Sequence, residues 1–228
     1  MSRSGPLLLA AAILMGPVAT SASPVPFVPL PYDMPNGDGV ASGGTFNYWD
    51  ALYNGAGNTM QDGAPLSGGW GKLTDGVAAT TPWFADADLG GTGLYVGWRR
   101  GFTTDPTLTF LFPVPVCLCV RLTIDSVTIW LDNTGVGGVG APLAILLDGL
   151  PLPFAPPAPG TVGPVAFGGL GLRGPFHDLQ FVQDPALPWT MVSEIQWTGF
   201  LTYIPAPGAV LLFGPALAFL GAFRRRAG

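Results

Sequence analysis

The chain has 228 residues, among them 34 glycines and 25 prolines, and a formal net charge of −5. Fourteen acidic side chains stand against nine Lys and Arg, and four of the nine, Arg3 and Arg224 to Arg226, lie near the two ends. This balance excludes a nucleic-acid-binding protein, because phosphate contacts need Lys and Arg. Seven Trp and fourteen Phe are far more than a disordered chain carries. The glycines and prolines therefore indicate turns between short strands, and an all-β fold.

The first 22 residues have the three parts of a secretory signal peptide. Arg3 supplies the positive charge, residues 6–18 are apolar, and Thr20 and Ala22 are the small residues that a cleavage site needs. We therefore expect an exported protein. Without its two apolar ends, the chain is long enough for one domain with long loops.

Residues 23–45 are rich in proline and glycine, and we expect an extended lead-in outside the core. Within it, residues 36–39 (NGDG) lack the ligand spacing of a calcium loop and predict a solvated turn. The β-sandwich domain is expected to occupy residues 46–203.

Period-2 alternation predicts short strands in that domain. Two early strands are expected at residues 94–99 and 107–112. Between residues 120 and 131 the apolar positions change from even to odd at Asp125 and Ser126, which requires a bulge or a turn there. Residues 143–147 are fully apolar and predict a central strand that ends in the Asp148-Gly149 turn.

Further strands are expected at residues 165–167, 170–172 and 179–182, and the last strand at residues 189–197 (WTMVSEIQW). In the last strand, alternation places Trp189, Met191, Ile195 and Trp197 on one face and Thr190, Glu194 and Gln196 on the other. About eight short strands without helices predict a β-sandwich, of the jelly-roll type.

Cys117 and Cys119 are the two cysteines of the chain. Three states stay open from their spacing: two buried thiols, a strained disulfide between them, or pairing with another molecule. Two Cys and one His are too few for a zinc site, which needs about four such ligands.

Residues 204–228 read as a sorting tail. A Pro-flanked box (Ile204, Pro205, Ala206, Pro207, Gly208) leads into an apolar run over residues 209–223, and Arg224, Arg225 and Arg226 close it. An apolar run of this kind partitions into the bilayer, and the arginines keep the end of the chain on the cytoplasmic side. We expect a single transmembrane helix, which is interrupted by Pro215 and suits a temporary anchor.

The order of box, helix and arginines resembles the PEP-CTERM sorting signal, although Ala206 stands where that family has its Glu. The resemblance implies an exosortase-type transpeptidase as partner. It also implies an inner-membrane intermediate, followed by the cell surface or the extracellular matrix of a Gram-negative bacterium that makes exopolysaccharide and biofilm. The alternative is an ordinary tail anchor without processing.

Over residues 46–200 the chain resembles the discoidin-like, galactose-binding-like sandwiches. The likeness rests on the LTDG turn at residues 73–76 followed by Trp83, on DSVTIWLD at 125–132, on the strand at 142–149 that ends in Asp-Gly, and on SEIQW at 193–197. The resemblance implies one structural Ca²⁺, held by Asp75, Thr80 or Thr81, and Glu194. In the alternative reading, Asp75 only caps its turn and Glu194 faces solvent.

Glycan binding would use an aromatic face beside polar groups at one end of the sandwich, and the candidates are Tyr53, Trp70, Trp83 and Arg99. Catalysis has little support, since the lone His177 has no nucleophile motif to serve. We therefore expect a non-catalytic surface or matrix protein, with a lectin-like glycan-binding module as the alternative. The two differ in whether the loop aromatics form an exposed cluster.

Overall fold

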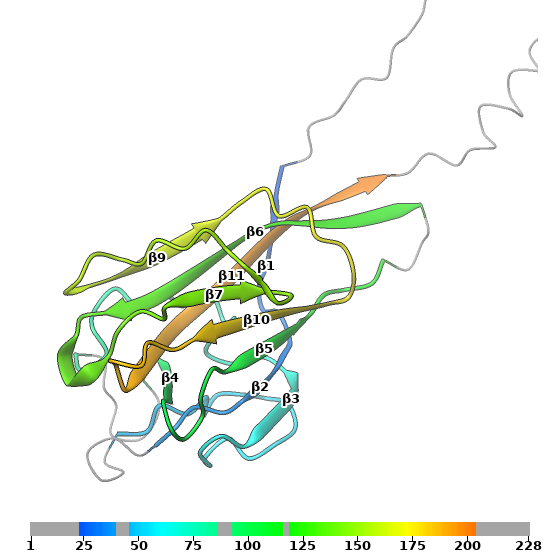
Figure 1. Ribbon diagram of the computed structural model, residues 1–228. Helices are drawn as coiled ribbons and strands as arrows, with labels where there is room; N and C mark the ends of the chain where they lie inside the picture. Colours follow the sequence, from blue (N-terminus) through cyan, green and yellow to red (C-terminus); the bar gives the residue numbers. More distant parts are fainter. Residues whose placement is uncertain (1–22, 40–45, 86–92, 116–118, 204–228) are drawn as a thin grey trace, which may run out of the picture.

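A computed structural model describes residues 23–39, 46–85, 93–115 and 119–203 (Figure 1). The expected signal peptide at 1–22 and the whole sorting tail at 204–228 lie outside these residues. Within the described part of the chain, no helix is long and apolar enough to cross a bilayer.

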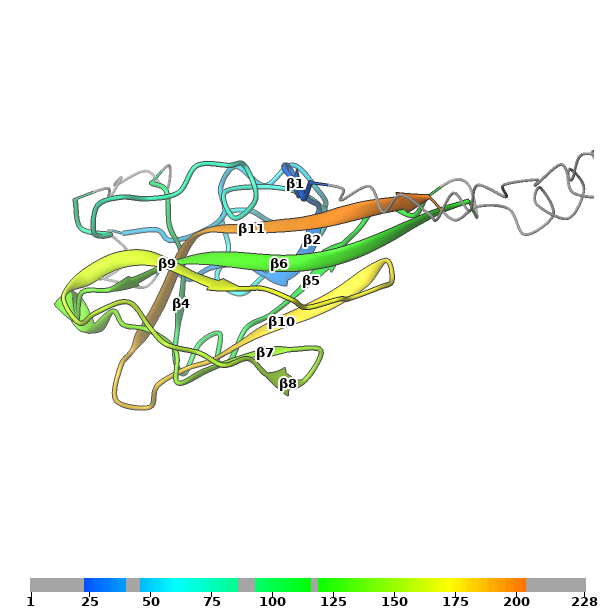
Figure 2. The same cartoon turned by 90° about the horizontal axis from the view of Figure 1, so that it is seen from above.

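The described residues form two antiparallel sheets, which confirms an all-β sandwich. Sheet A has the order β1-β11-β6-β9, with β4 also pairing with β11, and sheet B has the order β3-β2-β5-β10-β7-β8. Figure 2 shows the two layers from a second side. The strands are β1 Val25–Phe27, β2 Tyr32–Pro35, β3 Pro65–Gly69, β4 Val96–Arg99, β5 Thr107–Leu111, β6 Val120–Asn133, β7 Ala144–Leu147, β8 Leu150–Pro151, β9 Thr161–Phe167, β10 Phe176–Val182 and β11 Trp189–Tyr203.

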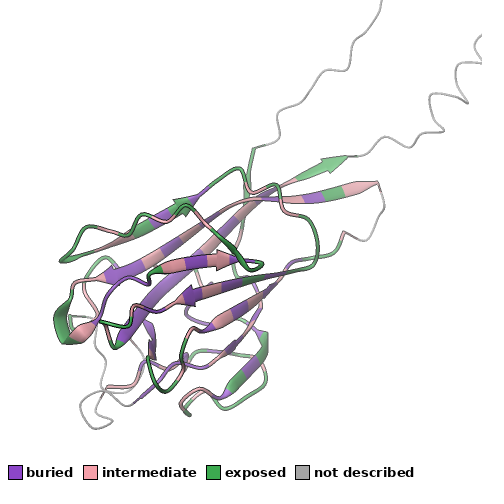
Figure 3. Cartoon of the chain, viewed as in Figure 1, coloured by how far each residue is buried: buried purple, intermediate pink, exposed green. Residues whose placement is uncertain are grey.

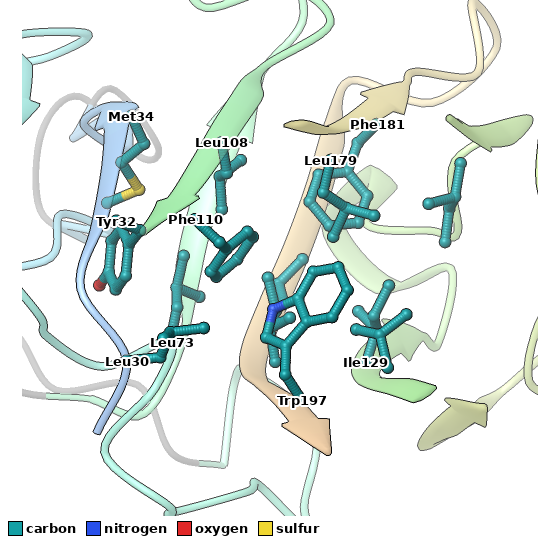
Figure 4. Packing of buried hydrophobic residues seen from close by; sticks show 14 of the residues in the cluster. Leu30, Tyr32, Met34, Leu73, Leu108, Phe110, Ile129, Leu179, Phe181 and Trp197 are labelled. Atoms are coloured by element: carbon teal, nitrogen blue, oxygen red, sulfur yellow. The ribbon is translucent and has the colours of Figure 1, made fainter. Parts of the chain in front are cut away.

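The main apolar core lies between the sheets and is built from the inward positions of both (Figure 4). Trp197 of β11 is fully buried and meets Phe110 of β5 edge to face, with ring centroids 5.1 Å apart. Trp98 of β4 stacks on Phe181 of β10 at 5.9 Å. Large aromatic side chains from facing strands therefore fill the space between the layers, and they carry much of the apolar burial that stabilises the fold.

The predicted change of phase in residues 120–131 is a β-bulge in β6. Thr198 pairs with Ser126, but the next residue of β11, Gly199, pairs with Ile124, so Asp125 is the extra residue. Leu122 and Ile124 before the bulge, like the apolar odd-numbered positions after it, belong to the main core. The bulge keeps both halves of one long strand facing inward.

The prediction of which residues of the last strand share a face is wrong in part, because β11 also contains a bulge. Val192 pairs with Leu131 and Glu194 with Trp130, which makes Ser193 the extra residue. Ile195 and Trp197 lie in the main core. Trp189 and Met191 instead join a second cluster outside sheet A, together with Tyr48, Ala79, Tyr95 and Val139. Thr190 and Glu194, expected on the opposite face, are buried as well.

The lead-in expected outside the core is part of the sandwich. β1 pairs with β11, and β2 lies between β3 and β5. Leu30, Tyr32 and Met34 belong to the main core. Proline is compatible with these positions because β1 lies at an edge and Pro35 ends its strand.

Three smaller expectations also need correction. β7 is not central, since only the two-residue β8 lies beyond it, and two of its four residues, Ala144 and Leu146, are half-buried. Residues 170–172 form no strand, only a bridge from Leu172 to Ile124. Cys119 is disulfide-bonded, so the expectation of two buried free thiols is wrong. Cys117 lies outside the described residues. The Asp148-Gly149 turn is confirmed, with φ of 50° and 78°.

Candidate functional site

The loop that carries the LTDG turn is fixed to the bulge of β11. The amide of Ile195 donates to the carbonyl oxygen of Leu73 at 2.7 Å, and the amide of Ala79 donates to the Ser193 hydroxyl at 3.1 Å. Leu73 is fully buried in the main core. The extra residue in β11 thus directs Ser193 and Glu194 toward residues 73–79, so two segments far apart in the sequence meet there.

Glu194 is the central group of this meeting point. Its side chain is 2% exposed, and Oε2 accepts the amide of Gly76 at 3.3 Å. Oε1 is buried and has no hydrogen-bond partner among the described residues. Burial, followed by the negative charge of Asp75, raises the pKa of Glu194 to about 8. Burial also raises the pKa of Asp75, whose Oδ1 accepts the amide of Val77 at 2.8 Å.

These observations test whether the residues fit a Ca²⁺ ion. A buried carboxylate oxygen without a donor, beside a second carboxylate, is a favourable place for a hard cation. The described residues hold no group of three or more His, Cys, Asp or Glu placed for a metal. The remaining ligands would therefore be carbonyl or hydroxyl oxygens and water, which Ca²⁺ accepts in coordination shells of six to eight oxygens. Asp75 and Glu194 supply carboxylate oxygens of the kind that Ca²⁺ takes.

The two threonines of the predicted set lie farther along the same loop. Thr80 and Thr81 are both exposed. The carbonyl oxygen of Thr81 accepts the Tyr95 hydroxyl at 2.6 Å. The structure therefore brings together Asp75 and Glu194 and rules out the reading in which Glu194 faces solvent, but it does not direct either threonine hydroxyl into the pair.

The four glycan candidates are not gathered into one exposed cluster. Tyr53 is buried, and its hydroxyl donates to the carbonyl oxygen of Tyr32 and accepts the amide of Gly69. Trp83 is half-buried, packs edge to face on Tyr48, and donates its indole N–H to the carbonyl oxygen of Val136 at 3.1 Å. Both side chains serve packing.

The other two candidates are more accessible but lie with different neighbours. Trp70 is 37% exposed, and its amide donates to Asn54 Oδ1 at 2.9 Å. The guanidinium carbon of Arg99 lies 5.0 Å from the centre of the Phe102 ring. Phe102 itself is exposed, and the sequence reasoning had not selected it.

Buried acids are a feature that the sequence reasoning missed. Residues 36–39 are not a solvated turn, since Asn36 and Asp38 are fully buried. Asp38 accepts the amide of Arg99 at 2.6 Å and the hydroxyl of Thr103 at 2.9 Å, so it ties two loops together. Asp50 accepts the hydroxyl of Tyr32 and the amide of Lys72. Burial raises the pKa of both carboxyls.

His177 has a partner that the sequence did not indicate. Its Nδ1 lies 2.7 Å from Asp148 Oδ2, and Oδ1 of Asp148 accepts the amide of Asp178 at 2.8 Å. The histidine ring is buried against Phe112. This pair holds the turn after β7 against β10.

The comparisons with known proteins place the chain in no family. No protein-family model and no curated protein matches it. Among solved structures, it is similar to a chain of BgaA, the β-galactosidase with multiple functions from Streptococcus pneumoniae. That match has a TM-score of 0.34 and 16% identity, and covers 55% of this chain and 82% of the other. A likeness of this size carries no argument about function.

Proposed function

We propose that this protein is a non-catalytic component of the cell surface or extracellular matrix, delivered by an exosortase-type sorting system and associated with exopolysaccharide. In this proposal, residues 1–22 direct export, a jelly-roll sandwich of the discoidin-like type is the body, and residues 204–228 are the sorting signal. The membrane holds the chain only before processing. The producing cell would be a Gram-negative bacterium.

One observation supports the proposal: the expected box follows the last described strand of the sandwich directly in the sequence. β11 is described as far as Tyr203, and the box would begin at the next residue, Ile204. Its last two residues, Thr202 and Tyr203, are exposed and pair with Arg121 and Val120 of β6, and the ends of these two strands project beyond the other strands as a short ribbon (Figure 1). A box directly after such a ribbon is within reach of a membrane-bound transpeptidase without unfolding of the core.

Intact mass of the protein recovered from the native cell surface tests sorting. We expect a product that lacks the residues after a point within 204–208, with or without an added group. A double variant, Pro205→Ala with Pro207→Ala, should keep the full tail and stay in the membrane fraction. A wild-type chain that retains Gly228 in the membrane fraction contradicts the proposal and favours an ordinary tail anchor.

The same proposal includes a structural Ca²⁺ at Asp75 and Glu194. The unpartnered Oε1 of Glu194 supports it, since ionisation of that buried carboxyl needs a positive partner. A bound cation would join residues 73–79 to β11 and hold this loop against sheet A. The proposed role of the ion is structural, and Glu194→Gln tests it.

A further inference from the structure

An open trough crosses one end of sheet B, whereas Glu194 lies on sheet A. It consists of two adjoining hollows with volumes of about 570 and 400 Å³, which share Pro35, Gly63 and Thr107. The floor comes from β2, β3 and the start of β5, and the wall comes from the turn after β4. A hollow of this size is comparable to the sites that hold small ligands or a few sugar rings.

Four aspartates line the trough, of which Asp38 is fully buried and the other three are held in fixed orientations. One oxygen of each accepts a backbone amide: Asp33 from Gly68 at 2.7 Å, Asp62 from Gly39 at 2.6 Å, and Asp105 from Gln183 at 2.8 Å. No Lys or Arg is among the described residues that line either hollow. The lining therefore carries a negative charge on side chains whose rotamers are already set, and the Arg99 guanidinium on the Phe102 ring is a cation at its edge.

An aromatic ring and several hydroxyls complete the lining. Phe102 is 59% exposed, although Arg99 packs on its ring at 5.0 Å. That contact orients the ring while leaving more than half of the side chain accessible. Thr104 and Thr107 line the same hollow, and Thr109 and Ser67 line the second one. An exposed ring beside fixed polar groups suits the C–H face of a sugar and its hydroxyls.

We propose that this trough binds a chain of amino sugars. Protonated ammonium groups would meet Asp33, Asp62 and Asp105, hydroxyls would bond to the threonines, and one ring face would pack on Phe102. A polysaccharide of acidic sugars would be repelled by the same carboxylates. The trough is a different surface from the four residues that the sequence suggested for glycan binding. Binding of an amino sugar there does not depend on sorting of the protein.

Calorimetric titration of the purified full-length protein with a glucosamine hexasaccharide tests this inference. We expect binding at a pH where the amines are protonated, with an affinity that falls as salt rises. Cellohexaose, the uncharged counterpart, should bind at least tenfold more weakly, and a hexamer of uronic acids should not bind.

Variants then locate the site. Phe102→Ala and Asp105→Asn should each weaken hexasaccharide binding at least tenfold. Asparagine suits residue 105 because it tolerates the positive φ of 49° and keeps an oxygen for the Gln183 amide. Phe176→Ala is the matched control, since Phe176 is equally exposed on β10 and lines neither hollow. Its affinity should not change, and thermal unfolding checks that each variant is folded.

Three results would overturn the inference. The first is an absence of binding by the folded wild-type protein at millimolar hexasaccharide. The second is equal binding of cellohexaose, which would mean that the amines are not recognised, or equal binding of poly-lysine, which would mean that the sugar is not recognised. The third is a folded Asp105→Asn variant with unchanged affinity.

Discussion

Replacing Glu194 by glutamine isolates the group on which the cation site depends. Glutamine keeps the shape of the side chain and an oxygen for the Gly76 amide, but it carries no charge. The pKa of Glu194 is about 8, against 4.5 for an ordinary glutamate. Since each pH unit of separation corresponds to about 1.4 kcal/mol, ionisation of Glu194 in the metal-free fold costs at most ~5 kcal/mol.

The sign of the pH dependence follows from the raised pKa. Between pH 4.5 and about 8 the folded state holds a proton that the unfolded state releases, so the free energy of unfolding falls as pH rises. The contribution is complete below 4.5 and lost above about 8. Without metal, Glu194→Gln should therefore be more stable than the wild-type protein at pH 9, and the two should be similar near pH 4.

Calcium should narrow the difference in stability between the two proteins at pH 9. A cation that binds only the folded state adds about 2.7 kcal/mol at a concentration one hundred times its Kd. We expect this gain in the wild-type protein and its loss in Glu194→Gln. Urea unfolding at pH 5 and pH 9, with EDTA or with CaCl₂, measures both effects. Asp184→Asn is the control, because it removes one carboxylate from an ordinary turn in which Asp184 accepts the Ala186 amide.

Two outcomes would refute this reasoning. If the chelated wild-type protein and Glu194→Gln lose stability in parallel between pH 5 and pH 9, the raised pKa belongs to other groups. If calcium stabilises both proteins equally, the ion binds elsewhere.

Two further predictions concern the core and the buried loop at residues 36–39. Trp197→Ala should lower the free energy of unfolding by about 3–5 kcal/mol, because it empties the contact with Phe110, whereas Trp70→Ala, at a partly exposed site, should change it by ~0.5 kcal/mol or less. Gly37→Ala should cost on the order of 3 kcal/mol, because its Cβ would lie 2.0 Å from the Tyr48 carbonyl oxygen, while Gly168→Ala meets no atom within 4 Å. Chemical denaturation of all four variants measures both differences, and equal losses within either pair would contradict the packing described above.

The alternation of apolar residues predicted β6 well but β11 poorly, for a physical reason. β6 is buried mainly on one face over residues 120–131, so its bulge at Asp125 appears in the sequence as a change of phase. β11 is buried on both faces from Trp189 to Ile195. A bulge in a strand without a polar face leaves no change of phase, and Ser193 therefore could not be identified from the sequence.

The polar loop residues show a second limit of sequence reasoning. Asn and Asp favour turns because their short side chains bond to nearby backbone groups. The same side chains can bond to backbone groups of a distant segment, as Asn36 does with the Asp50 amide at 2.8 Å. Composition alone does not distinguish an exposed turn from a buried link between loops, and residues 36–39 are the second kind.

No local sequence pattern identifies Asp75 and Glu194 as a cation-binding pair; the order and spacing of motifs along the chain do. Asp75 and Glu194 are far apart in the sequence, and only the resemblance to discoidin-like sandwiches linked them. Two of the glycan candidates are used in packing; the sequence does not show whether a tryptophan or tyrosine packs or faces water. Tyr53 and Trp83 pack, while the exposed ring beside the trough belongs to Phe102.

The two sheets differ in how their outer faces are used. Segments on either side of β3, which include residues 46–49 and 72–83, cover the outer face of sheet A around β4 and β11. There the Lys72 ammonium group donates a hydrogen bond to the Trp49 carbonyl oxygen, and Trp83 packs on Tyr48. On sheet B, outward residues of β5 and β10 stay partly or fully exposed, as Figure 3 shows by the alternation of colours. A cation at Glu194 would hold the covering loops against sheet A. Sheet B then remains the accessible surface for a ligand.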